Sequence, residues 1–318
     1  MHILREQFGL TRHDANPILA PRDFPNAEAV YNCGQTMYQG RTILLVAIML
    51  RTEPLPRMHV AESEDGVNFT IRPEPFITQS SHPVIGPLDK HPIDSRITYM
   101  ADEDIYYIMR PGGSDAGCAA FLGKTRDWET YEDIEVIAMP HNRVPCLFPE
   151  KINGKYVRLD RPYTLVVDPH NEPQYGNIWI SESPDLIHWG RHRLLLKSWS
   201  HWNRIKIGPT PPIKTDEGWL EIIHGVAGSC TGQRYYIGAC LLDLKDPSRI
   251  IGKAEGYLLC ADEWYEFMGR TPNVVFPCGA IADHEDDQLR VYYGGADTCI
   301  ALATGKLSEI IQICKNGR

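Results

Sequence analysis

The stretch HVAESEDGVNF (59–69) leads a short strand into a polar turn, and this pattern returns four more times along the chain. The later copies begin near residues 121, 178, 239 and 299, a spacing of about 60 residues throughout. Each copy follows an apolar strand that comes after a tight turn; these stretches are MYQGRTILLV (37–46), ITYMADEDIYYIMR (97–110), KINGKYVRL (151–159), KTDEGWLEII (214–223) and HEDDQLRVYY (284–293). A fixed period with several short strands per unit is typical of a β-propeller, in which each unit is one blade.

Five such units use all 318 residues, so the repeat predicts an all-β fold, a five-bladed β-propeller that occupies 1–318 as a single catalytic domain. We expect four strands in each blade, with the innermost strands near 42–49, 104–110, 155–161, 219–224 and 289–294. Only TGKLSEIIQICKNGR (304–318) has the pattern of a helix. A propeller of this kind gathers loops from every blade around one central depression, which is where we expect the functional site.

The composition excludes several classes of function. A formal net charge of −9 argues against nucleic acid or an anionic membrane as partner, because both require a basic footprint. The longest apolar run, ILLVAIML (43–50), is strand-sized and far short of the roughly 18 residues that span a bilayer. The start, MHILREQFGL, lacks the features of a signal peptide, so we expect a cytoplasmic protein. Nine cysteines without a C-x-x-C pair fit buried thiols in a reducing compartment.

Polar residues recur at corresponding positions of successive blades, near the strand ends. They are Asn32, Asp94, Arg96, Arg143, Arg161, Lys206, His224 and Asp297. For any one of them, a surface salt bridge or a turn is the simpler interpretation. Their repetition instead predicts a small pit whose fixed positive charge suits an oxyanion such as phosphate.

The strand KYVRLDRP (155–162) alternates between two faces if it is extended. One face carries Tyr156, Arg158 and Asp160, and the other carries Val157, Leu159 and Arg161. An arginine on an apolar face either reaches solvent at the strand end or points into a functional centre. The central channel of a propeller gives the second alternative a geometric basis.

Asp94 lies in a turn before a strand, between Pro92 and Arg96. An aspartate there is most often a turn or capping residue, but in a buried pit it becomes a candidate general acid. No adjacent motif supplies the second carboxylate that glycosidases normally need. A bound phosphate removes that need, because phosphate can itself be the nucleophile. Nucleophile elbows, phosphate-binding loops, dinucleotide fingerprints and zinc motifs are absent from the sequence, so we expect neither a metal nor a cofactor.

Ten motifs spread over nearly the whole chain are specific in combination. They are NPIL (16–19), AESEDGVNF (61–69), Asp-x-Arg (94–96), LFPEKINGKYVRLDRP (147–162), ISESPDLIHWG (180–190), KIGPTPPI (206–213), GWLEIIHGV (218–226), LLDLKDPS (241–248), TPNVVFPCG (271–279) and VYYGGADT (291–298). In these motifs the chain resembles the β-mannoside phosphorylases of glycoside hydrolase family 130, which are five-bladed propellers. The resemblance implies phosphorolysis of a β-mannosidic bond at a non-reducing end, which releases α-mannose 1-phosphate with inversion.

The resemblance also implies a role for each polar residue. Asp94 matches the general acid, which acts through the 3-hydroxyl of the bound mannosyl residue. Arg143, Arg161, Lys206 and His224 match the phosphate-binding positions. Asn32, Arg96 and Asp297 are assigned to substrate binding. The expected partners are a small β-mannoside and inorganic phosphate as co-substrate, and a homo-oligomer is possible.

This chain departs from the usual family pattern at several positions. Ser95 replaces a proline, Asp160 a histidine or asparagine, and Pro209-Thr210 an Ala-Gly pair. Near Ala47 an arginine that contacts the sugar is missing, and Arg51 or Arg57 is a candidate to replace it. These changes leave the linkage, 1,2 or 1,4, and the acceptor sugar open.

Two other functions compete with phosphorolysis. A β-mannosidase that uses water needs a base, for which Glu150 or Asp160 is available. A non-catalytic carbohydrate-binding propeller needs exposed aromatic residues such as Trp202, Trp219 or Tyr163, and no basic pit. Convergence of the four phosphate-binding candidates near Asp94 separates phosphorolysis from both.

Overall fold

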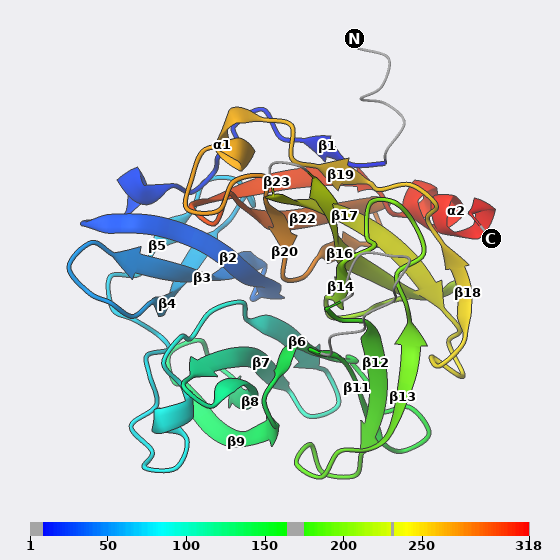
Figure 1. Cartoon of the computed structure of the whole chain (residues 1–318), viewed down its shortest axis with the longest axis horizontal. Coiled ribbons are helices and arrows are strands. Elements are labelled where there is room, and N and C mark those ends of the chain that lie inside the picture. Colours follow the sequence, from blue (N-terminus) through cyan, green and yellow to red (C-terminus); the bar gives the residue numbers. More distant parts are fainter. Residues whose placement is uncertain (1–8, 164–174, 230–231, 318) are drawn as a thin grey trace.

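The computed structural model describes residues 9–163, 175–229 and 232–317, and its strands form five antiparallel sheets arranged around a central axis (Figure 1). Blade 1 contains β2 (Ala27–Tyr38), β3 (Arg41–Leu50), β4 (Arg57–Ser63) and β5 (Thr70–Ile71). Blade 2 contains β6 (Arg96–Met100), β7 (Ile105–Ser114), β8 (Gly117–Thr125) and β9 (Glu132–Ala138). Blade 3 contains β10 (Asn142–Leu147), β11 (Tyr156–Pro162), β12 (Ile178–Ser183) and β13 (Gly190–Leu196). The predicted five-bladed propeller is confirmed.

Blades 4 and 5 carry additional short strands, so the expected four strands per blade are found only in blades 1 to 3. Blade 4 contains β14 (Lys206–Pro209), β15 (Ile213–Thr215), β16 (Gly218–Ser229), β17 (Gly232–Leu242), β18 (Ile250–Lys253) and β19 (Leu259–Cys260). Blade 5 contains β20 (Val275–Pro277), β21 (Ile281–Asp283), β22 (Gln288–Gly295), β23 (Cys299–Lys306) and β1 (Thr11–Arg12). Within residues 9–163, 175–229 and 232–317, the helices are two short 3₁₀ turns, η2 (Pro21–Asp23) and η3 (Gly86–Leu88), and the α-helices α1 (Trp264–Phe267) and α2 (Leu307–Asn316). Helix α2 confirms the helix predicted near the C-terminal end.

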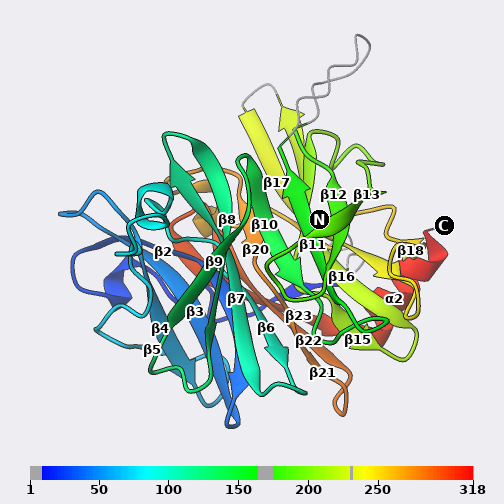
Figure 2. The same ribbon diagram turned by 90° about the horizontal axis from the view of Figure 1, so that it is seen from below.

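The innermost strands of the blades are β2, β6, β10, β14 and β20 (Figures 1 and 2). The predicted positions fall instead on the second strands β3, β7, β11, β16 and β22, so this prediction was wrong by one strand in every blade. The second strand is paired on both edges and covered on both faces, which is why it has the most continuous apolar run. The innermost strand lines the channel and therefore carries polar residues such as Asn32 and Arg143.

A repeated aspartate turn explains the period in the sequence. In blades 1 to 3, Asp65, Asp127 and Asp185 each accept hydrogen bonds from the backbone N–H groups two and three residues later. The next residue has a positive φ, which Gly66 adopts easily (φ 74°) and Trp128 adopts at φ 59°. These turns join the third and fourth strands of each blade.

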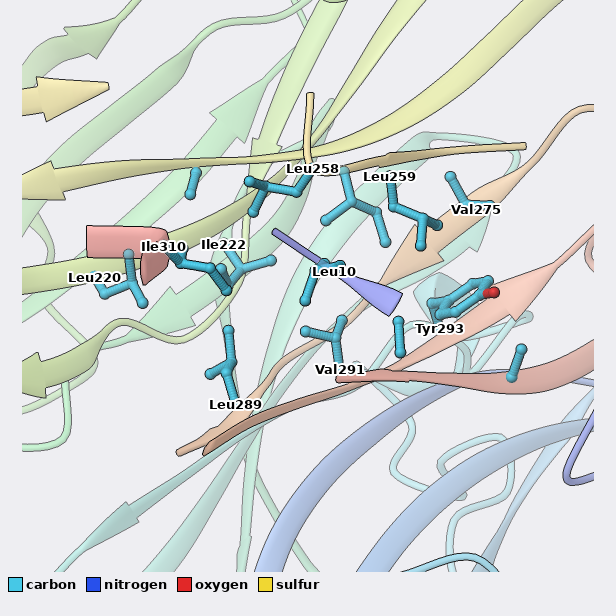
Figure 3. Packing of buried hydrophobic residues seen from close by; sticks show 14 of the residues in the cluster. Leu10, Leu220, Ile222, Leu258, Leu259, Val275, Leu289, Val291, Tyr293 and Ile310 are labelled. Atoms are coloured by element: carbon cyan, nitrogen blue, oxygen red, sulfur yellow. The ribbon is translucent and has the colours of Figure 1, made fainter. Parts of the chain in front are cut away.

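The core lies between neighbouring blades. The cluster between blades 4 and 5 packs Leu220 and Ile222 of β16 against Leu289 and Val291 of β22, and Ile310 of α2 joins it (Figure 3). All five are at most 1% exposed. Complete burial of such an aliphatic side chain contributes roughly 1.5–3 kcal/mol, so stability rests on the contacts between blades.

The ring closes in blade 5, where β1 pairs with β23. Arg12 of β1 donates hydrogen bonds from Nε and Nη2 to the two carboxylate oxygens of Glu266, at 2.8 and 2.7 Å. The Tyr293 hydroxyl donates to the same carboxylate at 2.7 Å. Strands from opposite ends of the chain are thus fastened in one sheet. Across the described residues, no helix is long and apolar enough to cross a membrane.

Candidate active site

One half of the central pit, which we call the carboxylate half, joins blades 1, 2 and 5 through Asn32. Its Nδ2 donates to Asp94 Oδ1 at 2.8 Å and lies 3.4 Å from Asp297 Oδ1. Asn32 sits where the register of β2 shifts, Asp94 lies two residues before the start of β6, and Asp297 lies in the turn after β22. All three have a positive φ, between 45° and 53°, a conformation in which Asn and Asp are enriched. These backbone irregularities turn the three side chains toward one another.

This half is packed closely and retains open polar atoms. A Cβ at Gly294 would lie 2.0 Å from Asn32 Oδ1, so only glycine fits there. Asn32 Oδ1 is buried without a hydrogen-bond partner and remains an unused acceptor. Burial raises the pKa of Asp297, and the neighbouring charge of Asp94 raises it further. The half therefore offers hydrogen-bonding groups suited to a polar, neutral ligand.

The other half, which we call the basic half, places Arg161 of β11 against His224 of β16. Arg161 Nη1 lies 3.0 Å from His224 Nε2, and both side chains are buried. Burial, together with the charges of Arg161, Arg96 and Lys206, holds the pKa of His224 well below its usual value, so its Nε2 accepts the Arg161 N–H. Burial lowers the pKa of Arg161 to about 10, and Arg143 and Arg96 contribute in the same direction.

Lys206, the first residue of β14, adds a third positive group. Burial and then the charges of Arg161 and Arg143 lower the pKa of Lys206 to about 7. The charges of Asp297 and Asp94 oppose this shift. Phe276 connects the two halves, since its ring lies 4.7 Å from the His224 ring and 5.2 Å from the Arg96 guanidinium. Arg143 pairs with Arg161 across β10 and β11 and is exposed, so this residue marks the solvent side of the site, which we call the mouth of the pit.

Arg96 lies beneath the carboxylate half and is only 1% exposed. Its Nη1 donates to the backbone carbonyl of Asp94 at 2.5 Å and lies 3.3 Å from Cys278 Sγ, while the guanidinium lies over the Phe276 ring at 5.2 Å. Nε and Nη2 of Arg96 have no hydrogen-bond partner. These contacts favour a supporting role for Arg96 under Asp94.

The cations of the pit lack carboxylate partners. In the part of the chain that the structure describes, Arg96, Arg143, Arg161 and Lys206 form no ion pair with Asp or Glu. Clustered cations depress one another's pKa unless an anion joins them, and an oxyanion accepts charge-assisted hydrogen bonds from such groups. The structure thus brings together all eight candidate residues, in an arrangement whose cations lack a counter-charge.

The glycoside hydrolase family 130 profile, described as β-1,4-mannooligosaccharide phosphorylase, matches residues 11–316. The chain belongs to this family. It is 31% identical over 310 residues to a β-1,4-mannooligosaccharide phosphorylase of Ruminococcus albus, which covers 96% of this chain and 90% of that protein. It is 37% identical over 261 residues to a β-1,2-mannobiose phosphorylase of Listeria innocua, covering 81% and 68%. The solved structure of a Listeria innocua β-1,2-mannobiose phosphorylase in complex with β-1,2-mannobiose superposes with a TM-score of 0.84 at 29% identity, covering 96% of this chain and 99% of that one.

Neither carboxylate considered as a base for hydrolysis lies free in the pit of this family 130 enzyme. Asp160 points to the other face of β11, where it accepts from Arg158 Nη2 at 2.9 Å and from Asn142 Nδ2 at 3.2 Å. Glu150 lies on the surface and pairs with Lys214 at 2.6 Å. The alternation predicted for this strand is confirmed, and it places Arg161 in the pit and Asp160 outside it.

Two of the aromatic residues considered for sugar stacking are in the core instead. Trp202 and Trp219 are completely buried between blades 3 and 4. Tyr163 is exposed beside the pit. Near Ala47, which is itself buried, Arg57 forms an ion pair with Glu53 and Arg51 is exposed.

Tyr235 of β17 is a site residue that sequence reasoning missed. Its ring lies 5.0 Å from Lys206 Nζ and 6.2 Å from the His224 ring, with an interplanar angle of 29°. Burial raises the pKa of Tyr235 to about 12, so its hydroxyl stays protonated. In the β16–β17 hairpin Tyr235 pairs with Val226, two residues beyond His224, and this pairing was the available signal.

Proposed function

We propose that this family 130 enzyme catalyses the inverting phosphorolysis of a β-mannosidic bond at the non-reducing end of a short mannoside. The products are α-mannose 1-phosphate and the acceptor sugar. The observation that carries the proposal is the set of cations without carboxylate partners, Arg143, Arg161 and Lys206, next to His224 and adjoining Asp94. A hydrolase has no need of such a set, because its nucleophile is neutral water.

The residues divide the reaction between the two halves of the pit. Phosphate, held by Arg143, Arg161, Lys206 and His224, attacks the anomeric carbon from the α face. A bond forms between a phosphate oxygen and that carbon while the glycosidic bond breaks. Asp94 supplies the proton that the departing oxygen needs, relayed by the 3-hydroxyl of the mannosyl residue as the family resemblance implies. Asn32 fixes the Asp94 carboxylate, and Asp297 is available to sugar hydroxyls.

The experiment is a comparison of β-mannosides incubated with and without inorganic phosphate. We expect mannose 1-phosphate to appear only when phosphate is present, with α configuration by phosphorus and proton NMR. The β-1,2- and β-1,4-linked disaccharides are tested side by side, since relatives of both kinds match this chain. Release of free mannose at the same rate in the absence of phosphate would establish hydrolysis instead.

The same proposal covers the surroundings of the reaction. Phosphate serves as a co-substrate, and neither a metal nor an organic cofactor takes part; prolonged dialysis against a chelator should leave the rate unchanged. A cytoplasmic location is supported by the eight cysteines among the described residues, which are all unpaired and of which seven are buried.

A further inference from the structure

Three aromatic side chains form a wall at the mouth of the pit. The rings of Tyr163 and Tyr175 stack with centroids 5.5 Å apart and an interplanar angle of 24°. The His141 ring lies 6.0 Å from that of Tyr163, tilted by 48°. Tyr163 is 46% exposed, and Tyr175 is partly buried. We refer to His141, Tyr163 and Tyr175 as the aromatic wall.

The wall stands directly above the cations of blade 3. Arg143 and Arg161 are paired across β10 and β11, and two residues closer to the mouth the Tyr163 N–H donates to the His141 carbonyl at 2.8 Å. Two residues of an extended strand span about 6.5–7 Å, so the wall lies within one sugar unit or two of these arginines. Side chains two residues apart share a face, so Tyr163 and Arg161 border the same space.

Blade 4 fixes the third ring. The Tyr175 N–H donates to the Ile205 carbonyl at 2.7 Å, and Gly176 bridges to Lys206. A Cβ at Gly176 would lie 2.5 Å from Arg161 Cδ, so the chain at this point packs against the phosphate-binding arginine. The aromatic wall is therefore held by the same segments that hold Arg161 and Lys206.

The position of the wall matches the direction in which the acceptor leaves. Arg161 is 5% exposed and His224 is 0% exposed, whereas Tyr163 is 46% exposed, so a phosphate held by these two groups lies deeper in the protein than the aromatic wall. In an inverting displacement the leaving group departs from the face of the anomeric carbon opposite the nucleophile, which is toward the mouth. Tyrosine rings offer rigid apolar area with a polar edge, and the C–H face of a pyranose packs flat on such a ring.

We propose that the aromatic wall binds the acceptor part of the β-mannoside, so that His141, Tyr163 and Tyr175 set the preference among acceptors. This inference rests on the proposed phosphorolysis and names the part of the substrate that these residues contact. It predicts stronger binding of acceptors that contain two or more sugar units than of single sugars, because a longer acceptor covers more of the ring surface.

The test is the reverse reaction, in which mannose 1-phosphate donates to mannose, mannobiose or mannotriose as acceptor. Tyr163→Ala should raise the KM for the disaccharide and trisaccharide acceptors about tenfold and leave the KM for mannose 1-phosphate within twofold. Tyr163→Phe should behave as the unmodified enzyme, because it keeps the ring. Tyr175→Ala should act in the same direction as Tyr163→Ala, with a smaller effect.

A matched control is Tyr99→Ala. Tyr99 is also exposed, at 39%, and stacks on another tyrosine, Tyr106, at 4.6 Å and 29°, but it lies in β6 three residues beyond Arg96 and away from the pit. This variant should leave both KM values unchanged. An acceptor KM within twofold of the unmodified enzyme in both Tyr163→Ala and Tyr175→Ala would overturn the inference, as would an equal rise in the KM for mannose 1-phosphate. Failure of the proposed function looks different, since the unmodified enzyme would then form no mannose 1-phosphate from mannosides and no mannoside from mannose 1-phosphate.

Discussion

In the carboxylate half, built by blades 1, 2 and 5, the side-chain amide of Asn32 donates hydrogen bonds to the carboxylates. In the basic half, built by blades 3 and 4, cations lie beside one another. Asn32 connects Asp94 and Asp297, and burial raises the pKa of Asp297. On the other side burial lowers the pKa of Lys206 and of Arg161, and no described carboxylate pairs with either. The carboxylates are therefore held by hydrogen bonds to Asn32 without a ligand, whereas the cations of the basic half lack a counter-charge.

The difference shows where substrate binding changes the protein most. A neutral sugar adds hydrogen bonds to a half that is already ordered. A phosphate dianion supplies the countercharge that Arg161 and Lys206 lack, so it should raise their pKa values toward normal. Substitutions in the carboxylate half should therefore lower kcat, whereas substitutions in the basic half should raise the KM for phosphate.

The largest expected effect comes from the carboxylate half. Asp94→Asn keeps the size of the side chain but cannot deliver a proton, and we expect a loss of about 10²–10⁴-fold in kcat, in both directions of the reaction. The thermal midpoint, measured in parallel, should show that the fold is intact. An activated aryl mannoside is the matched substrate, because its leaving group needs little protonation and its turnover should largely survive. Near-normal turnover of a natural mannoside in both directions would show that Asp94 is a turn residue and not the general acid.

The basic half should respond in binding rather than in turnover. Arg161→Ala removes charged hydrogen bonds worth about 1.5–3 kcal/mol, and we expect the KM for phosphate to rise on the order of 10–100-fold. Arg193→Ala, an exposed arginine in β13 of the same blade, is the control and should have no effect. An unchanged phosphate KM in Arg161→Ala would remove this residue from the phosphate site.

A smaller effect, a gradual change in the apparent affinity for phosphate, should follow a change in pH. Because the pKa of Lys206 is lowered to about 7, the ammonium is present below pH 7 and is lost as the pH rises above it. The apparent phosphate affinity should therefore fall between pH 7 and 8.5, and binding near pH 7.5 should take up protons, as calorimetry in buffers of different ionisation enthalpy can measure.

Lys206→Arg separates this effect from the ionisation of phosphate itself. Arginine stays charged over this range, so the decline above pH 7 and the proton uptake should both diminish. If the variant and the unmodified enzyme have the same pH profile, the titration of another group causes the decline.

The fold and most of the site could be predicted from the sequence because both leave local signals. The repeated aspartate turns mark the blades, and polar residues at strand ends interrupt apolar patterns, as Arg161 does. The innermost strands were misplaced because apolar content identifies the strand with most neighbours, not the strand nearest the axis. Tyr235 was missed because its role depends on a hairpin register.

Burial between blades was the other property that the sequence did not reveal. Trp202 fits against blade 4 only because Gly225 and Gly238 lack a side chain; a Cβ at either would lie 2.3 Å from the indole. Likewise, Arg96 reads as a surface cation in isolation, yet it is enclosed by Phe276 and Cys278 from another blade. The Trp202 contacts join residues more than 20 positions apart and the Arg96 contacts join residues about 180 positions apart, so both lie beyond the range of a local pattern.

The ion pair between Arg12 and Glu266 determines when the enzyme becomes active as the chain is translated. Residues from all five blades contribute to the pit, and the sheet of the last blade is completed by a strand from the first part of the chain. A nascent chain with four finished blades therefore has no catalytic pit, however well those blades have formed. Turnover therefore requires that all five blades have formed and that the ring is closed. A protease cut that releases β1 should inactivate the enzyme although it removes no residue that contacts the substrate.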